Sequence, residues 1–349
     1  MKLETYDNVI VSIKKNANRR FHLLLGNGFS VAYDPTIFSY NALHSFVSKL
    51  KDDDLSKVLT VVETRNFEII MQYLDHFSAL VEAFGGDPAL KARVDGASSK
   101  LKRSLLQAVK ELHPEHVFTV PEDKIKACAA FLGTFLATGG SLFSTNYDLL
   151  LYWALMRAGG ALSHIDGCGR ELENDTGEYM KEEEQEWSDL KWGKYRDTQN
   201  IFYLHGALQF FDTGAEILKE NYDAYNYLLG KISARMENGQ YPVFVAAGDG
   251  EQKLNHITHN QYLTYCYDNL CKVTGSLVTF GFGFGPYDEH VIDAINRAAK
   301  RKPPNKLFSV YISAYSDADH QHIEDIASKI KCKVHVYDAK TVNVWGKAS

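Results

Sequence analysis

Short apolar segments of strand length recur along this chain, and stretches with helical spacing separate most of them. Parallel strands need a crossover of a dozen or more residues, usually a helix, so the alternation predicts a parallel sheet covered on both faces. The expected class is therefore α/β, with a Rossmann-like, doubly wound parallel sheet. The expected strands lie at residues 21–25, 142–144, 201–204, 243–247, 277–282, 308–312 and 334–337.

The interval between the first two expected strands is unusually long. From residue 41 to residue 136 apolar residues recur at intervals of three and four, as in Phe67, Ile70 and Leu74. Such a block is too long for a plain crossover. We expect a helical cap at 41–136, inserted after the first strand and packed over one end of the sheet, within a single domain spanning 1–349.

Charge and cysteine content exclude several classes of protein. The 44 acidic and 38 basic residues give a net charge of −6, which disfavours direct binding to nucleic acid or to an anionic membrane surface. The apolar stretches are strand-sized, so no membrane span or secretory signal is expected. Five cysteines, without closely paired spacing, indicate reduced thiols and a cytoplasmic protein.

Residues 171–197 are strongly acidic and include Trp187 and Trp192. We interpret this segment as a solvated surface excursion. An interaction patch is the alternative.

A glycine-containing turn follows the first expected strand directly, at Gly26, Asn27, Gly28, Phe29 and Ser30. Two glycines let the backbone approach a phosphate or ribose closely, and N–H groups at a helix start can hold anionic oxygens. The same pattern ends many strands for purely steric reasons. The turn also lacks the third glycine of the dehydrogenase fingerprint and the lysine of a P-loop.

A second polar group follows the second strand, where Thr145, Asn146 and Asp148 precede an expected helix at 149–157. The carboxyl ends of strands in open α/β sheets are where ligands bind, so these side chains are well placed for chemistry. Helix capping alone is an alternative explanation for them.

Two further strand ends carry candidate residues. His205 and Gly206 end the apolar run at 201–204, although a lone histidine at such a position is more often structural than catalytic. Gly281, Gly283 and Asp288 follow the strand at 277–282, and Asp288 is also a natural N-cap for a helix at 289–299. Each group has a structural explanation, but their repetition at four strand ends favours a ligand site.

The order and spacing of these motifs resemble those of the sirtuin-like family. The resemblance lies in the glycine turn at 26–30 followed by Pro35 and Phe38, the Thr-Asn-Tyr-Asp signature at 145–148, the His-Gly pair at 205–206 and the late glycine and aspartate segment at 277–292. Within that family the chain looks closest to bacterial proteins that hydrolyse NAD, often as effectors of phage defence.

The resemblance implies a NAD glycohydrolase that releases nicotinamide and ADP-ribose. Asn146 and His205 would be catalytic, with Asp148 orienting the loop or the ribose. Residues 26–30, Thr145, Gly281, Gly283 and Asp288 would form the nucleotide pocket. The resemblance further implies a regulated antiviral effector that forms a homo-oligomer and responds to a companion protein or a phage trigger.

One departure separates the chain from protein-deacylating sirtuins, which carry a zinc ribbon built from two close cysteine pairs. Cys266 and Cys271 lie five residues apart in an expected helix, where Tyr262, Leu263, Cys266 and Leu270 read as a buried face. No metal is therefore expected, and NAD is expected as substrate alone.

Two other functions stay open. A nucleotide-binding sensor or assembly subunit would bind NAD or ADP-ribose without cleaving it. A protein deacylase or ADP-ribosyltransferase would consume a protein acceptor together with NAD, and ranks last.

Overall fold

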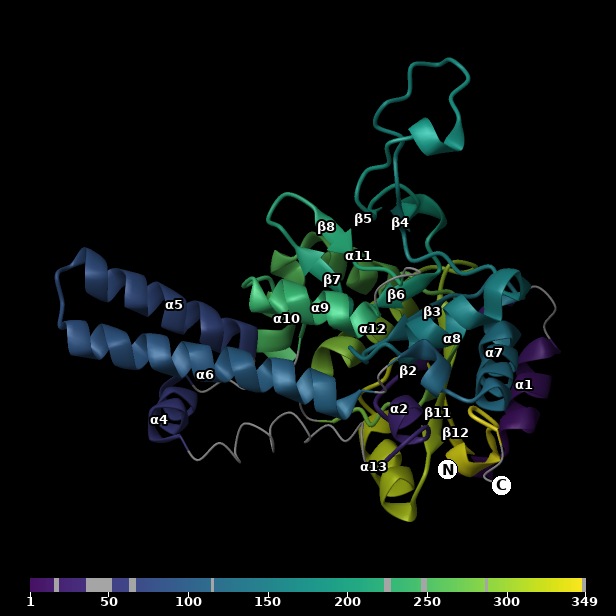
Figure 1. Cartoon of the computed structure of the whole chain (residues 1–349). Helices are drawn as coiled ribbons and strands as arrows, with labels where there is room; N and C mark the ends of the chain where they lie inside the picture. The colour runs from purple at the N-terminus through teal and green to yellow at the C-terminus, as the bar shows by residue number, and fades with distance from the viewer. Residues whose placement is uncertain are drawn as a thin grey trace.

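The computed structural model describes residues 1–15, 19–35, 52–62, 67–113, 116–222, 227–245, 250–285 and 288–346. Figure 1 shows a body of strands and helices from which a long helical hairpin extends. Among the described residues, no helix combines the length and apolar character needed to cross a membrane.

The body is built on a seven-stranded sheet in which every pair of neighbours is parallel. The strand order is β1-β12-β11-β10-β2-β3-β6. The predicted α/β, Rossmann-like class is thereby confirmed. The strands are β1 (Leu3–Glu4), β2 (Phe21–Leu25), β3 (Leu142–Ser144), β6 (Ile201–Tyr203), β10 (Gly275–Phe280), β11 (Leu307–Ala314) and β12 (Lys333–Asp338).

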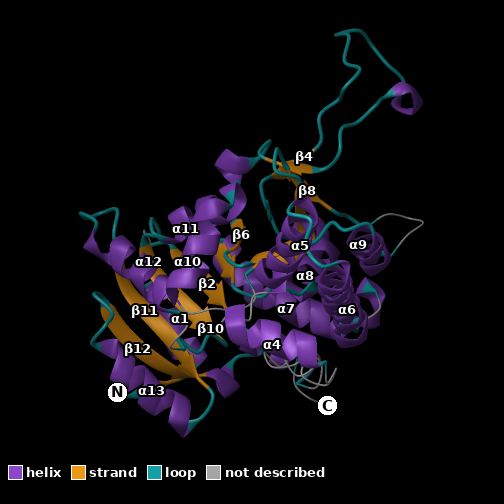
Figure 2. Ribbon diagram, turned by 90° about the vertical axis from the view of Figure 1, so that its left-hand side faces the viewer, coloured by secondary structure: helices purple, strands orange, loops and turns teal. Residues whose placement is uncertain are grey.

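The central strands are rich in apolar residues and carry a few buried polar ones, His22 in β2 and Ser276 and Thr279 in β10. All five residues of β2 and all six of β10 are buried, as expected where helices cover both faces. Figure 2 shows β12, β11, β10 and β2 side by side with helices around them. Those helices include α1 (Tyr6–Lys14), α8 (Leu150–Ala158), α10 (Gly250–His259), α11 (Gln261–Leu270), α12 (Glu289–Lys300) and α13 (Asp317–Ala327).

A second sheet of five antiparallel strands, in the order β4-β5-β8-β7-β9, was not predicted. Its strands are β4 (Cys168–Gly169), β5 (Lys191–Trp192), β7 (Gly206–Asp212), β8 (Ile217–Lys219) and β9 (Pro242–Phe244). The strand expected at 243–247 corresponds to β9, so its assignment to the parallel sheet was wrong. Residues 246 and 247 lie outside the described residues.

Helices are confirmed within the described part of 41–136, whereas the placement of this block as a cap over one end of the sheet is not confirmed. Helices α5 (Phe67–Ala83) and α6 (Pro88–Leu112) pack on each other as an antiparallel arm that extends from the body (Figure 1). Helix α4 (Asp53–Val62) lies beside them, whereas α7 (Glu122–Leu136) packs on β2 and β3 as part of the body. Residues 41–51, 63–66 and 114–115 lie outside the described part of the chain.

The acidic segment at 171–197 divides into two parts. The portion around the short helix η3 (Glu182–Glu184) projects from the body at the top of Figure 1. Trp187 is exposed, whereas Trp192 is buried in β5. The surface excursion is therefore shorter than predicted, because the end of the segment joins the second sheet.

Candidate functional site

The four strand ends with candidate residues are neighbours in the main sheet. Strands β10, β2, β3 and β6 are consecutive in the sheet order, and all run in the same direction. Their carboxyl ends therefore meet at one edge. The order of strands along the chain reverses beside β2, which is the position where open α/β sheets bind ligands.

The turn after β2 packs directly against the turn after β10. The Gly28 N–H donates to the Gly281 carbonyl at 2.8 Å, and the Gly26 N–H donates to the Phe280 carbonyl at 3.0 Å. A Cβ on Gly28 would lie 2.5 Å from the Gly281 Cα, and one on Gly26 would lie 2.5 Å from the Gly281 oxygen. Close packing of the two turns therefore requires glycine at positions 26 and 28, and this explains both residues without a ligand.

A buried polar network connects the turn after β2 with the residues after β3. The Asn146 Nδ2 donates to the Ser30 Oγ at 2.8 Å, and the Ser30 hydroxyl donates to the Asp148 Oδ2 at 2.5 Å. All three side chains are buried. Thr145 adds a further link, since its N–H and hydroxyl both donate to the Leu25 carbonyl.

Burial weakens Asp148 as an acid. Removal from water raises the pKa of Asp148 to about 6, although the hydrogen bonds from Ser30 and from the Leu150 N–H favour its ionised form. The bond to Leu150, at the start of α8, agrees with the helix-end role considered above. Asp148 therefore both holds the network together and satisfies one N–H of a helix terminus.

His205 lies beside this network and pairs with a second histidine. Its Nε2 is 2.9 Å from the Nε2 of His290, and its ring also bonds to the Thr145 backbone carbonyl. Burial, followed by the proximity of His290, holds the pKa of His205 well below its usual value. Burial likewise lowers the pKa of His290 to about 4. Both rings are neutral at pH 7.

The two protein segments that carry these groups run alongside each other. The Leu204 N–H donates to the Ser144 carbonyl, and the Leu208 N–H donates to the Tyr147 carbonyl. The segments at 144–148 and 204–208 are thereby held in register around the His205 ring. The structure thus brings together Ser30, Thr145, Asn146, Asp148 and His205.

Asp288 does not cap α12 through its side chain, although it occupies the N-cap position. Its Oδ1 instead bonds to the Nζ of Lys253 at 2.9 Å, and Lys253 is only 2% exposed. A buried lysine needs such a partner because an isolated charge is costly away from water.

Phe29 and Gly283, both expected in the nucleotide pocket, differ in burial. Phe29 is fully buried, with its ring 4.9 Å from that of Trp345 and its carbonyl accepting the indole N–H at 2.8 Å. Gly283 is exposed in the turn after β10. Asn27 is partly exposed, and Phe38 lies outside the described residues.

Sequence reasoning missed two residues of this region, His290 and Lys253. Each lies in a helix with no local pattern that separates it from an ordinary helical residue. Their partners are 85 and 35 residues away in the chain, so only the tertiary structure reveals the pairs.

Cys128 and Cys266 are buried and behave as packing residues. Tyr262, Leu263, Cys266 and Leu270 form the predicted buried face of α11. Within the described ranges, no three His, Cys, Asp or Glu side chains are grouped as metal ligands would be.

Fold and site together define an α/β protein with a Rossmann-like sheet and a buried polar cluster at its carboxyl edge. The family described as "Domain of unknown function (DUF4917)" matches residues 23–345, and the chain therefore belongs to this family. The match spans β2 to Trp345 and so includes every residue of the cluster. No curated protein matches the chain significantly.

Proposed function

We propose that this protein is a NAD glycohydrolase that cleaves NAD to nicotinamide and ADP-ribose. The observation that supports this most is the convergence of Ser30, Asn146 and the His205 segment at the edge of one parallel sheet. An amide, a carboxyl and a neutral imidazole are held there within a single hydrogen-bonded region.

Cleavage of NAD does not require a general acid. Cleavage of the bond between nicotinamide and ribose passes through an oxocarbenium-like state, as other glycosidic cleavage does. The leaving group is a cationic pyridinium that departs as a neutral molecule. The site must therefore hold the ribose, exclude bulk water and direct one nucleophile.

Asn146 is suited to hold the ribose. Its Nδ2 is bonded to Ser30, which fixes the plane of the amide and directs Oδ1 as an acceptor for a ribose hydroxyl or a water. Asp148 holds Ser30 in turn and acts as a positioning residue.

His205 is the proposed general base. The His205 and His290 rings are both neutral at pH 7, so the pair is unprotonated, and the bound substrate has to raise their lowered pKa values before a ring accepts a proton from a ribose hydroxyl or a water. The Nε2 of His205 already faces His290, so proton uptake requires the pair to reorganise when substrate binds.

The test is a chromatographic assay of NAD incubated with purified protein, alone and with extract from phage-infected cells as a source of the trigger, for the wild type and for the variants Asn146→Ala and His205→Ala. We expect each variant to lose at least about a hundredfold in rate, the size typical of a lost general base. Matched controls are Asn8→Ala on α1 and His259→Ala on α10, which remove the same side chains from exposed positions. Full activity in a folded Asn146 or His205 variant contradicts the assignment.

A sensor that binds NAD or ADP-ribose without cleaving it is the second candidate. It is favoured by the bonds within the cluster, since Ser30 is engaged with Asn146 and Asp148, and His205 with His290. Calorimetry with both nucleotides, followed by chromatography of the recovered NAD, separates the two functions. Tight binding with intact NAD after long incubation supports the sensor.

We further propose that the protein acts in the cytoplasm as a regulated antiviral effector. Uncontrolled hydrolysis of NAD would harm the host cell, so activity requires a companion protein or a phage trigger. A silent purified protein should then become active in extract from infected cells, and NAD consumption in that extract should depend on Asn146.

We propose that a second copy of the chain docks on the outer face of α5. Tyr73, Phe77, Leu80 and Phe84 are spaced by four, three and four residues and are 56%, 49%, 53% and 84% exposed. This is the spacing of a coiled-coil seam. The exposed residues His76, Ala79 and Ala83 carry no carboxylate or ammonium, whereas the exposed Asp75 and Glu82 lie about half a turn around the helix from the seam.

A second copy is the natural occupant because the seam is uncharged and can pair with itself about a twofold axis. Its large side chains expose roughly 450 Å² per copy, judged from the size of aromatic side chains. Two copies would bury about 900 Å², close to the area at which specific interfaces begin.

We expect an oligomer by analytical ultracentrifugation, and a smaller species for Phe77→Glu. Tyr179→Glu, in the acidic excursion, is the control. A monomeric wild type contradicts this docking.

A further inference from the structure

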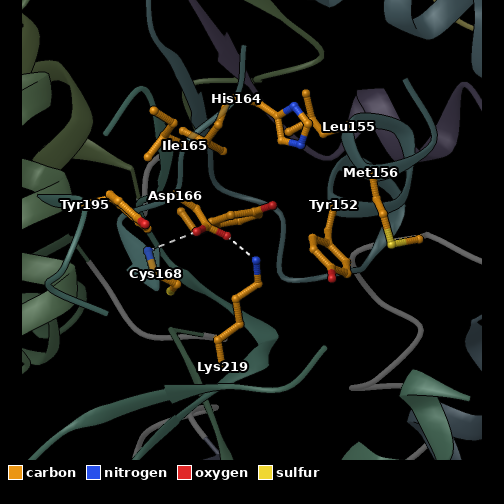
Figure 3. A pocket seen from close by; sticks show the side chains of 11 residues that line it. Tyr152, Leu155, Met156, His164, Ile165, Asp166, Cys168, Tyr195 and Lys219 are labelled. Carbon is orange, nitrogen blue, oxygen red and sulfur yellow. Dashed lines mark hydrogen bonds and ion pairs between the residues drawn. The ribbon is translucent and has the colours of Figure 1, made fainter. Parts of the chain in front are cut away.

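A second polar pocket lies outside the cluster described above. It has a volume of about 470 Å³, which is in the range of small-molecule sites. Its walls come from α8, the segment at 164–168, β6 and β8, and Figure 3 shows their side chains. The lining residues are Tyr152, Leu155, Met156, His164, Ile165, Asp166, Cys168, Tyr195, Ile201, Tyr203 and Lys219.

An ion pair between Lys219 and Asp166 forms one side of this pocket (Figure 3). The two side chains are only 9% and 16% exposed. The second oxygen of Asp166 accepts the Cys168 N–H at 3.1 Å. The Lys219 ammonium also lies 4.5 Å from the centre of the Tyr152 ring.

Both members of the pair are charged. Burial would raise the pKa of Asp166, but the neighbouring Lys219 outweighs it and holds that pKa below its usual value. Burial would lower the pKa of Lys219, and the Asp166 carboxylate likewise outweighs it. The pocket therefore contains a fixed donor and a fixed acceptor side by side, in surroundings from which water is largely removed.

Flat rings line much of the remaining surface. Tyr152, Tyr195 and His164 contribute the accessible rings, and Met156 and Ile165 are apolar. Tyr203, Leu155 and Ile201 lie behind them and are at most 2% exposed. The His164 Nδ1 donates to the Leu162 carbonyl at 2.8 Å, which fixes the orientation of the ring. Such walls favour a flat ligand with an apolar face and hydrogen-bonding groups on its edge.

The charge of the pocket further limits the class of ligand that it can bind. Lys219 is the one cation among the lining residues, and Asp166 neutralises it. The pocket therefore offers no surplus positive charge to a phosphate.

We infer that this pocket binds a planar nitrogen heterocycle of the purine or pyrimidine class, as the free base or nucleoside. Its ring lies against the tyrosines, and its donor and acceptor edge faces Lys219 and Asp166. The site shares no residue with the Ser30, Asn146, Asp148 and His205 cluster, so it is independent of the proposed hydrolase activity.

The test is isothermal titration calorimetry of the full chain with adenine, adenosine, AMP, uracil, uridine and UMP. We expect at least one base or nucleoside to bind with a Kd below about 1 mM, and its nucleotide to bind more weakly. Met156→Trp fills the pocket without touching the ion pair and should weaken binding at least about tenfold. Val11→Trp, at an exposed position of α1, should leave binding unchanged. The proposal is overturned if no base or nucleoside binds, or if Met156→Trp binds as tightly as the wild type.

A second readout places the ligand in the pocket. The Cys168 thiol lines it, whereas Cys332 is a partly exposed thiol elsewhere. The base or nucleoside that binds in calorimetry should slow alkylation of Cys168 by iodoacetamide and leave Cys332 unaffected, as measured by peptide mass spectrometry. Equal slowing at both cysteines, or none at Cys168, contradicts the assigned location.

Discussion

The carboxyl edge of the main sheet and the pocket beside β8 each bury a carboxyl group, yet the two groups differ as acids. Asp148 accepts hydrogen bonds from the Ser30 hydroxyl and the Leu150 N–H, and burial raises its pKa to about 6. Asp166 accepts from the Cys168 N–H and from Lys219, and its pKa is lowered. The decisive difference is the cation, because burial acts on both groups in the same direction.

This comparison separates two uses of a buried charge. Lys219 stabilises an ionised Asp166, so that pocket keeps a permanent donor and acceptor. Asp148 lacks such a cation among its described bonds, and its charge is sensitive to pH close to neutrality. A group of this kind is typical of sites that reorganise or react, although structural networks also shift pKa values.

Removal of the cation should have the largest effect on stability. Lys219→Met leaves Asp166 buried without its partner, and we expect a loss of about 3–5 kcal/mol in urea unfolding. Lys191→Met is the matched control, since Lys191 pairs with Glu216 near the surface and such pairs contribute about 0–1 kcal/mol. The double variant Asp166→Leu, Lys219→Met should recover much of the loss. A small effect of Lys219→Met would show that the pair is solvated.

The pH dependence of stability should differ in sign between the two carboxyls. Asp148 has a raised pKa, so the folded protein binds its proton more tightly than the unfolded chain does between about pH 4 and 6. Stability attributable to Asp148 should therefore fall as the pH rises through this window, by up to about 3 kcal/mol. Asp148→Asn should lack this fall, which urea unfolding at a series of pH values measures.

Asp166 should behave in the opposite way. Its lowered pKa means that the ionised group contributes stability above the pKa of the unfolded chain, and that this contribution is lost as the pH falls through the folded value. Comparison of the wild type with Asp166→Asn isolates this contribution. The same sign at both positions would contradict the comparison.

The glycine turns should give the smallest of these effects. Gly28→Ala places a Cβ 2.5 Å from the Gly281 Cα, and we expect a loss of about 1–3 kcal/mol from overpacking. Gly283→Ala meets nothing within 4 Å and should change stability by less than about 0.5 kcal/mol. Thermal unfolding of both variants checks the difference, and equal stability would mean that the two turns do not touch in solution.

Much of the main sheet was predictable because its strands are buried on both faces. Phe21–Leu25 and Leu142–Ser144 are short, mostly apolar segments followed by glycine or polar residues, and the structure places both strands at the predicted residues. The same property made it possible to place the candidate residues at strand ends. The order of the strands in the sheet was not predictable, because it depends on contacts between distant segments.

The second sheet escaped prediction in part because four of its five strands have only two or three residues. Cys168–Gly169 and Lys191–Trp192 have two residues each, too few to show a period of two. Helical spacing likewise identified α5 and α6 as helices, but it did not show that they pack on each other and not on the sheet. A helix that packs on a sheet and a helix that packs on another helix have the same apolar stripe.

The candidate site was predictable in its local motifs but not in its partners. Ser30, Asn146 and His205 were identified from the residues that follow strands, and the structure joins them through Thr145 and Asp148. The pairing of His205 with His290 could not be foreseen, because an isolated histidine in a helix has no pattern that indicates its partner.

The central claim is that Asn146 and His205 act on one ribose at the carboxyl edge of the sheet. A crystal structure with ADP-ribose bound tests it most directly. We expect ribose hydroxyls within hydrogen-bonding distance of the Asn146 amide and the His205 ring, and the pyrophosphate beside the turn at 26–30. ADP-ribose bound elsewhere, including the pocket beside Lys219, with both side chains free of it would contradict the account.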